Sequence, residues 1–490
     1  MSEHLPALQI VVPMIAAPIC VLLRRRALVW PFALAAAWTS FGSSILLLRR
    51  VLQSGPWSYA MGGWAAPYGI EYRADAAGAF VVFFVAALGA IVLTYAPRSV
   101  DREIPRGKHH LFCAAYLLCM TGLQGIAITG DLFNVFVFLE ISALSSYALI
   151  SLGAERRALT ATFQSLVMGT IGATFILIGV GLLFMMTGTL NMVDMAQRLQ
   201  PEGQRTALVA FAFLSVGIAT KMALFPLHLW LPNAYTYAPS VVTAFLAATS
   251  TKVSVYIGLR FIFHIFGESF AFERMPLDAT LMPLALMGIV VASAVAIFQT
   301  NVKRLLAYSS IAQIGYMVLG ISLATETGLT GGIVHLFNHA ITKGGLFLAM
   351  GCIAYRIGSV RREDTRGLGR RMPVTMFLWV LGGLSLIGVP GTAGFVSKWY
   401  LVLGALQSGF WPVAVLLLLS SLLAVAYVWR VVETAYFREP PEGSKREEAP
   451  LSLLLPACAL IAATVYFGFE TSLTADVAKT AASQLLGGRP

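Results

Sequence analysis

The sequence predicts an all-α protein that crosses a membrane many times. Of its 490 residues, 58% are hydrophobic and only 12% are charged, and the mean hydropathy is +0.78. A soluble domain carries about 25% charged residues, so this composition excludes a soluble fold. The apolar runs reach the ~20 residues that a bilayer-spanning helix needs. Strands of a membrane barrel would alternate over about ten residues, and these longer, continuously apolar runs favour helices.

Fourteen apolar runs are candidate spans. They begin near residues 6, 28, 74, 111, 131, 160, 206, 239, 279, 305, 328, 373, 411 and 450. Segment 49–73, between the second and third runs, is rich in Gly and Trp and predicts an external hairpin. We therefore divide the chain into four parts: 1–110 with spans 1–3 and the hairpin, a five-helix unit 111–270, a second five-helix unit 278–438, and 450–490 with span 14 and a tail.

The basic residues predict how the chain is oriented. Loops after odd-numbered spans hold 20 of the 34 Lys and Arg residues, whereas loops after even-numbered spans and the termini hold 8. Cytoplasmic loops are the ones enriched in Lys and Arg. The odd loops are therefore expected in the cytoplasm of a bacterial or archaeal cell, and both termini outside its inner membrane. The net charge of +11 thus reflects membrane orientation, and no nucleic-acid partner is expected.

The two five-helix units look like repeats. Sliding the chain by 170 residues places Phe225 on Phe395, Trp230 on Tyr400 and Arg260 on Arg430. Five spans per unit mean that the second copy, spans 9–13, enters from the side opposite to the first copy, spans 4–8. Inverted repeats of this kind are a device of transporters. The alternative is that apolar segments resemble each other through composition alone.

Two spans are predicted to be broken. Span 7 contains Pro226 and ends at Leu231-Pro232, and span 12 carries Gly388-Val389-Pro390-Gly391 at its middle. Proline removes a backbone donor and clashes with the preceding turn. Backbone groups freed in hydrocarbon must lie inside protein or beside water, so the breaks at Pro226 and Pro390 mark the interior of a transport path.

Five charged residues lie within the spans: the acid Glu140 in span 5, and Lys221, Lys252, Lys343 and Lys398. A charge at the bilayer centre costs at least ~2.5–3.5 kcal/mol, and such residues usually mark ion or proton routes. Lys221 precedes the span 7 break and is the expected partner of Glu140. A Glu–Lys pair with a movable separation is a proton switch, since the acid releases its proton when the cation approaches. The alternatives are a structural hydrogen bond for Glu140 and snorkelling for Lys221.

The remaining charges extend this axis. Lys252 follows hydroxyl residues 249–251, and His335, His339 and Lys343 are spaced four apart, hence on one helix face. That face can relay protons. A zinc site is the alternative for the two histidines, but no third ligand is evident and no metal or cofactor is expected. Lys398 follows the span 12 break and maps onto His228 at the 170-residue offset.

Other polar groups are expected to have structural roles. Arg260 and Arg430 lie near span ends, and Glu433 follows Arg430 by one turn, which predicts a surface Arg–Glu pair. The five cysteines form no CxxC pair and are expected to be small core residues. They are Cys20, Cys113, Cys119, Cys352 and Cys458.

The chain resembles the antiporter-like membrane subunits shared by Mrp-type Na+(K+)/H+ antiporters, proton-pumping NADH:quinone oxidoreductase (complex I) and membrane-bound hydrogenases. The resemblance covers about residues 60–430. It rests on the stretches LFNVFVFLEISALSSYALI, ATKMALFPLHLWLPNAY, TKVSVYIGLRF, NVKRLLAYSSIAQIGYM, HLFNHAITKGGLF and GVPGTAGFVSKWYL.

The resemblance implies fourteen helices, inverted five-helix repeats, broken helices 7 and 12, and a polar axis at mid-membrane. By motif, Glu140 and Lys221 match the family's helix 5 acid and helix 7 lysine, and Lys252 its helix 8 base. His335, His339 and Lys343 match the helix 11 polar set, and Lys398 the terminal helix 12 residue. Length and the lysine in span 12 look most like the D-type subunit of Mrp antiporters. Ser165, where an aromatic is expected, and the stretch NAYTYAPSVVTAF leave a divergent subgroup open.

Three functions are therefore weighed. The first is a proton-translocating subunit of a multi-subunit Na+/K+:H+ antiporter, a secondary transporter rather than an enzyme, partnered by other membrane subunits and the lipid bilayer. The second is the same channel in a redox-driven complex. No nucleotide-binding motif or cysteine cluster is present, so electron carriers would lie in partner subunits. The third is a scaffold with vestigial charges. A Na+ site needs several oxygen ligands, so protons are expected in this chain and Na+ elsewhere in the complex.

Overall fold

The computed structural model describes residues 2–200 and 205–487, almost all of them helical. The first half contains α1 (Leu5–Leu23), α2 (Arg26–Ser54), α3 (Ala76–Glu103), α4 (His109–Ile128), α5 (Leu132–Ser151), α6 (Arg157–Thr187), α7 (Met192–Arg198), α8 (Arg205–Met222), α9 (Trp230–Tyr237) and α10 (Ser240–Leu259). The second half contains α11 (Leu277–Ile297), α12 (Val302–Ser322), α13 (Glu326–Ile357), α14 (Leu368–Arg371), α15 (Pro373–Ile387), α16 (Ala393–Gln407), α17 (Trp411–Val432), α18 (Leu451–Phe469) and α19 (Ser472–Leu486).

The predicted polytopic all-α fold is confirmed. Thirteen helices of the described residues are long and apolar enough to cross a bilayer. The remaining predicted span, span 12, consists of two 15-residue helices, α15 and α16, joined by residues 388–392. Three short π-helical segments adjoin these helices: η4 (Arg260–Phe266) extends α10, η5 (Phe270–Arg274) precedes α11, and η7 (Glu433–Phe437) extends α17. Four 3-10 segments also lie in the described residues: η1 (Ser2–His4), η2 (Met61–Gly63), η3 (Arg106–Lys108) and η6 (Glu363–Thr365).

Both predicted breaks are present. Span 7 is divided into α8 and α9 by residues 223–229, which contain Pro226, and span 12 is divided by residues 388–392, which contain Pro390. At the 170-residue offset, the first break maps onto 393–399, so the second break comes about one turn earlier in its unit. Because of this shift, Lys221 comes just before the break of span 7, whereas Lys398 comes just after the break of span 12.

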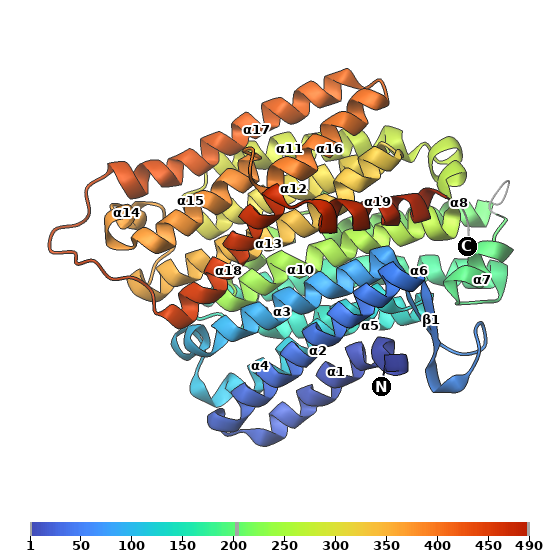
Figure 1. The fold of residues 1–490 in the computed structure, drawn as a ribbon, viewed down its shortest axis with the longest axis horizontal. Coiled ribbons are helices and arrows are strands. Elements are labelled where there is room, and N and C mark those ends of the chain that lie inside the picture. The colour runs from blue at the N-terminus through green and yellow to red at the C-terminus, as the bar shows by residue number, and fades with distance from the viewer. Residues whose placement is uncertain (1, 201–204, 488–490) are drawn as a thin grey trace.

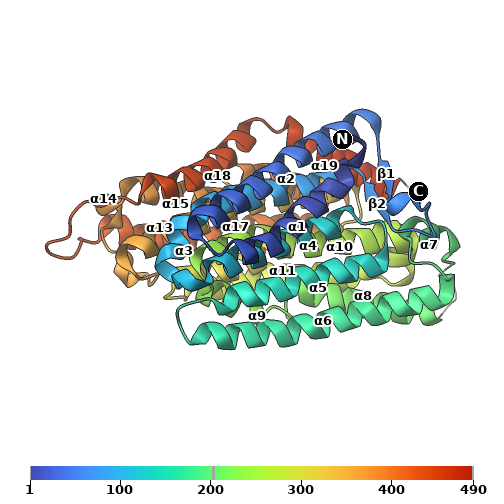
Figure 2. The same ribbon diagram turned by 90° about the horizontal axis from the view of Figure 1, so that it is seen from below.

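The long helices lie side by side, with α10 and α13 at the centre of the bundle (Figure 1). These two helices pack against each other, and α13 also contacts α12, α15, α16, α18 and α19. Figure 2 shows α5, α6 and α8 along one face and α18 and α19 along the opposite face. The beginning of α1 and the end of α19 lie toward the same end of the bundle, as an even number of crossings requires (Figure 1).

Two segments differ from their predicted description. The 49–73 hairpin starts later than expected, because α2 continues to Ser54, and its strands are β1 (Trp57–Ala60) and β2 (Glu71–Ala74), paired antiparallel. The tail after span 14, for which no secondary structure was predicted, forms α19. Residues 1 and 488–490, the outer limits of the first and last predicted parts, lie outside the described residues.

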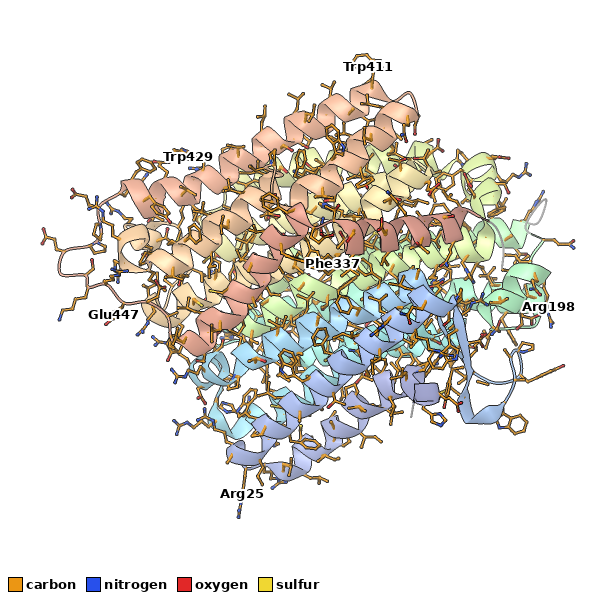
Figure 3. All side chains as sticks on the ribbon, viewed as in Figure 1. Arg25, Arg198, Phe337, Trp411, Trp429 and Glu447 are labelled. Atoms are coloured by element: carbon orange, nitrogen blue, oxygen red, sulfur yellow. The ribbon has the colours of Figure 1, made fainter. Side chains whose placement is uncertain are left out.

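The two ends of helix α17 indicate where the two membrane interfaces lie. Trp411 and Trp429 are both more than half exposed and stand near its two ends (Figure 3). Eighteen residues of helix span about 27 Å, close to the ~30 Å of a bilayer core, and tryptophans favour its two interfaces. Between them the exposed side chains are apolar, including Leu418 and Leu422. Ser420 and Ser421 therefore lie near mid-membrane.

Candidate functional site: a buried polar axis

Glu140 and Lys221 form an ion pair between α5 and α8. Lys221 Nζ donates to Glu140 Oε1 at 3.4 Å. The Lys221 side chain is 9% exposed, but that of Glu140 is 25% exposed, so the acid is less buried than an intramembrane position suggested. The sequence correctly placed the two groups together, because each occupies the middle of its span.

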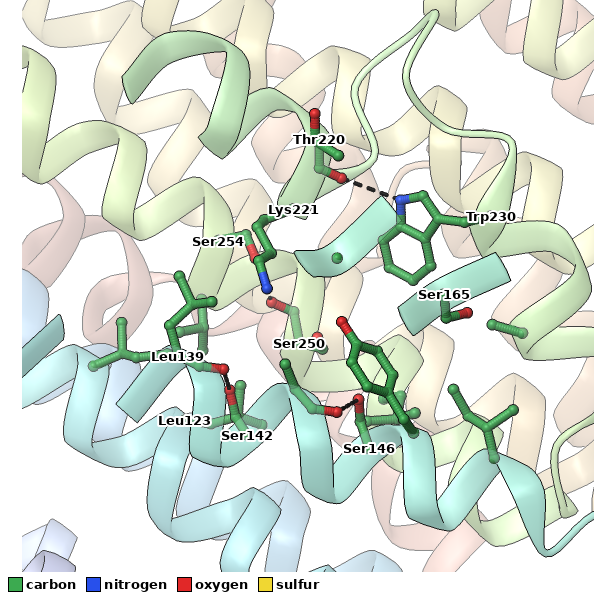
Figure 4. A pocket seen from close by; sticks show the side chains of 18 of the residues that line it. Leu123, Leu139, Ser142, Ser146, Ser165, Thr220, Lys221, Trp230, Ser250 and Ser254 are labelled. Carbon is green, nitrogen blue, oxygen red and sulfur yellow. Dashed lines mark hydrogen bonds between the residues drawn. The ribbon is translucent and has the colours of Figure 1, made fainter. Parts of the chain in front are cut away.

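A cavity of about 50 Å³ opens beside Lys221, the basic member of this pair (Figure 4). One water needs about 10–15 Å³, so several fit. Its walls carry hydroxyl residues of five helices, α5, α6, α8, α9 and α10: Ser142, Ser146, Tyr147, Ser165, Thr220, Tyr235, Ser250 and Ser254. Ser165, which departs from the family's expected aromatic, is part of this wall and is buried. The cavity can hold the water that a proton needs to reach or leave the Glu140–Lys221 pair.

The span 7 break is stabilised by a side chain from beyond it. Trp230 Nε1 donates to the carbonyl oxygen of Thr220 at 3.1 Å (Figure 4). Thr220 lies in the last turn of α8, where carbonyl groups lose their helical partners. His228, within the break, stacks on Phe225 at 5.3 Å. The indole therefore fixes the position of the turn that carries Lys221.

Lys252 and Lys343 occupy the centre of the bundle, and both are completely buried. Lys252 Nζ donates to the carbonyl oxygen of Ala247 at 2.5 Å. Lys343 Nζ donates to the carbonyl oxygen of Leu306 at 2.8 Å and to Ser309 Oγ. Each ammonium is thus held by neutral oxygens, and neither forms an ion pair with an acid of the described residues.

His335 and His339 continue the axis along α13. Their rings stack with centroids 5.8 Å apart and an interplanar angle of 7°, so they share a helix face as predicted. His335 bonds Ser397 Oγ and Gln313 Oε1, each at 2.8 Å. Both ring nitrogens of His339 are buried without a hydrogen-bond partner among the described residues. Buried polar atoms are nearly always satisfied, so water belongs beside His339.

Lys398 terminates the axis at the second break. Its Nζ donates to the carbonyl oxygens of Leu386 at 3.1 Å and Ile387 at 2.8 Å, and to Ser421 Oγ at 3.1 Å. These carbonyls end α15, where the helix dipole favours a cation. Lys398 Nζ also lies 4.8 Å from the centroid of the Tyr316 ring, which is 5.6 Å from that of His335. The contact with Ser421 places Lys398 near mid-membrane.

The predicted residues do not form one continuous chain of contacts. Glu140 and Lys221 form an ion pair. The stacked His335 and His339 rings are connected to Lys398 through Tyr316. Lys252 and Lys343 are each bonded to neutral oxygens. No hydrogen bond within residues 2–200 and 205–487 joins Lys221 directly to Lys252. Lys252 lies on α10, whose Ser250 and Ser254 line the cavity together with Lys221.

Sequence reasoning missed one buried ion pair. Arg260 Nη2 donates to Asp75 Oδ1 at 2.5 Å and Arg260 Nε donates to Tyr256 Oη at 2.7 Å. Burial alone would raise the pKa of Asp75, but the Arg260 guanidinium and the N–H of Gly78 outweigh it and hold that pKa below its ordinary value. Asp75 is the N-cap of α3, an acid that directly precedes an apolar run, which is the signal that was available.

Two other charges differ from expectation. The predicted Arg430–Glu433 pair is wrong, because Arg430 Nη1 donates to the carbonyl oxygen of Ile297 at 2.6 Å and Glu433 pairs with Arg438 at 3.6 Å. Arg430 turns toward α11 because its guanidinium can satisfy the last carbonyls of that helix. Lys303, one of the basic residues counted in the loop after span 9, is buried in the first turn of α12 and donates to the carbonyl oxygen of Ala238.

The described residues contain no group of three or more His, Cys, Asp or Glu side chains placed to hold a metal ion. Four of the cysteines are buried and Cys458 is partly buried, and all five are free thiols. They pack as core residues, as their apolar surroundings predicted.

Comparison with known proteins gives consistent matches. A family model described as the transmembrane part of NADH:quinone oxidoreductase and Mrp antiporters matches residues 129–424. The chain is 42% identical to the N subunit of NADH-quinone oxidoreductase of Desulforudis audaxviator over 94% of this chain and 93% of that protein. It is 29% identical to the D-type subunit of the Na+/H+ antiporter of Bacillus subtilis over 98% and 96%. A chain of the archaeal membrane-bound sulfane sulfur reductase, a respiratory membrane complex, superposes with a TM-score of 0.90 at 32% identity over 99% of this chain and 98% of that one.

Proposed function

The chain belongs to the NADH:quinone oxidoreductase/Mrp antiporter transmembrane family, and from this premise we propose that it is a proton-translocating subunit of a multi-subunit membrane complex. The observation that carries the proposal is the mid-membrane axis of titratable groups from Glu140 to Lys398. Protons reach the Glu140–Lys221 pair through the water cavity, pass the buried lysines and histidines, and leave at Lys398. Each group in this series can bind and release a proton, so a proton crosses without any group leaving its helix.

Repulsion between ammonium groups couples the protonation of one group of the axis to that of the next. Lys343 follows His339 by one turn on α13, and Lys252 lies on α10, which packs against α13. A proton that arrives on one of them disfavours protonation of the next, as like charges do. Charging the Lys221 end of the axis therefore drives a proton toward Lys398, and a change in the Glu140–Lys221 separation controls when this happens.

For the complex itself, we propose a cation/proton antiporter with Na+ or K+ carried by other subunits. The match to the D-type antiporter subunit extends over nearly the whole of both chains. The alternative is a redox-driven complex, which the 42% identity to the N subunit of NADH-quinone oxidoreductase favours. In either assembly the chain is a multi-pass subunit of a bacterial or archaeal cytoplasmic membrane, with the basic loops inside and both termini outside.

The first experiment tests the axis. Glu140→Ala and Lys221→Ala are each expected to abolish proton movement by the complex in everted membrane vesicles, followed with a pH-sensitive dye, while the complex still assembles. Glu447→Gln, an exposed loop carboxylate, is the control and should move protons normally. Undiminished proton movement in both alanine variants would refute the assigned roles.

The second experiment separates the two kinds of complex. Vesicles that contain the complex are given Na+ or K+, and separately an electron donor, and proton movement is recorded. The antiporter proposal expects proton movement on addition of the cation and none with the donor. The opposite result, together with co-purifying redox subunits, would replace it with the redox-driven alternative.

A further inference from the structure

Helix α19 packs one face on the bundle and turns a polar face outward. Its inward side chains are small, including Ala475, Ala478 and Ala482, and are buried where α19 contacts α13 and α3 (Figure 1). Small residues allow helices to approach closely in a membrane, so α19 is a packed part of the bundle. Its outward side carries one exposed apolar side chain, Leu473, and several exposed polar groups. Together with Glu470 at the start of the helix, we call these polar groups the α19 face: Glu470, Ser472, Asp476, Lys479 and Thr480.

The α19 face begins near mid-membrane. Ser421, halfway between Trp411 and Trp429, bonds Lys398, which in turn bonds the end of α15. The next residues form the span 12 break, and a Cβ at Gly391 would meet the Phe469 ring at 3.2 Å. Glu470 follows Phe469 directly and therefore lies at the depth of the break.

The rest of the α19 face lies in the outer half of the bilayer. Lys479 Nζ lies 6.0 Å from the centroid of the Tyr400 ring, and Tyr400 is only two residues beyond Lys398. Asp476 is between Glu470 and Lys479 on the same helix. A carboxylate, an ammonium and two hydroxyl groups are thus turned outward at hydrocarbon depth.

Lipid chains cannot cover such a surface, because they offer no hydrogen-bond partners. The outward faces of two other helices carry no charge: residues 411–429 of α17 and 158–187 of α6 contain no charged side chain, and their exposed residues include Leu418, Leu422, Phe163 and Ile171. Bulk water would not cover this region either, because the neighbouring helix α16 exposes the apolar side chains of Trp399 and Leu406. The polar surface therefore requires protein.

We propose that the α19 face is an interface for a transmembrane helix of a neighbouring subunit, a helix that presents hydrogen-bonding side chains to Glu470 and Asp476. The proposal deepens the proposed function, which makes this chain one subunit of a larger complex. Glu470 accepts from the N–H of Ser472 at 3.1 Å and from its hydroxyl. A carboxylate has about four acceptor sites, so it retains capacity for donors from the neighbour.

The test places a photo-crosslinking amino acid at position 480 in place of Thr480, and separately at position 422 in place of Leu422, in the assembled complex in its native membrane. The probe at 480 is expected to attach to a peptide of a membrane subunit that also co-purifies with the tagged chain. The probe at 422 is expected to attach to lipid. The double variant Glu470→Leu/Asp476→Leu should then reduce co-purification of that subunit at least tenfold, whereas Leu418→Ala should not.

The outcomes are distinct. If the probe at 480 attaches to lipid or to no membrane subunit while the complex keeps all its subunits, the α19 interface is wrong and the proposed function stands. If the double variant retains the cross-linked subunit fully, the interface is also wrong. If the tagged chain purifies without any other membrane subunit, the proposed function fails with it.

Discussion

Substituting Lys398 separates its structural contribution from its role in proton transfer. In Lys398→Met, the carbonyl oxygens of Leu386 and Ile387 lose their charged donor at mid-membrane. Leaving a buried acceptor unsatisfied costs about 1–3 kcal/mol, so two cost about 2–6 kcal/mol. Removing an ammonium group from the bilayer centre stabilises the folded protein by about 2.5–3.5 kcal/mol. The two effects largely offset each other, and the net loss of stability should stay below about 4 kcal/mol.

The assay therefore has two readouts, assembly of the complex with its thermal unfolding, and proton movement in vesicles. Lys398→Met should assemble, unfold at a moderately lower temperature and move no protons. Lys398→Arg keeps the charge and the donors, but arginine does not release its proton in proteins. It should unfold like the natural protein and also move no protons. Lys445→Met, in an exposed loop, is the control. Proton movement by the arginine variant would refute the reasoning, as would failure of the methionine variant to assemble.

Further predictions concern residues that hold the axis in place. Trp230→Phe removes the hydrogen bond to Thr220 and should lower stability by about 0.5–1.5 kcal/mol, measured as a lower unfolding temperature. Asp75→Asn leaves the Arg260 guanidinium buried without its counter-charge and should cost about 3–5 kcal/mol in the same assay. Because the folded-state pKa of Asp75 is depressed, its contribution is complete above the unfolded pKa of about 3.9 and is lost as pH falls through the lower folded value. Acid unfolding of Asp75→Asn should accordingly show a weaker dependence on pH in that range, and an unchanged dependence would contradict the ion pair.

Much of the fold could be predicted because a bilayer leaves few choices. Apolar runs of about 20 residues must be helices. The prolines of spans 7 and 12 indicated the breaks, although proline alone does not decide, since α1 continues through Pro13 and Pro18. The extent of α2 and the helix α19 were missed for a related reason. The α19 sequence is short and amphipathic, with alanines inside and polar groups outside, so it lacks the pattern of an apolar span.

The candidate site was predicted only in part. The mid-span charges stand out because each is costly, which is why Glu140, Lys221 and Lys398 could be found without a structure. Their partners could not, since Lys398 bonds main-chain carbonyls and Lys343 bonds a serine hydroxyl, groups that are present along every span. The Asp75–Arg260 pair joins residues 185 positions apart, and only the packing of α3 on α10 brings them together.

A connected proton route requires water at the places where the side chains do not touch. The most direct measurement is a density map of the assembled complex at a resolution that shows ordered water. We expect water in the cavity bounded by Ser250 and Ser254, and water within about 3.2 Å, hydrogen-bond distance, of at least one ring nitrogen of His339. A dry cavity, with His339 enclosed by apolar side chains alone, would contradict the account.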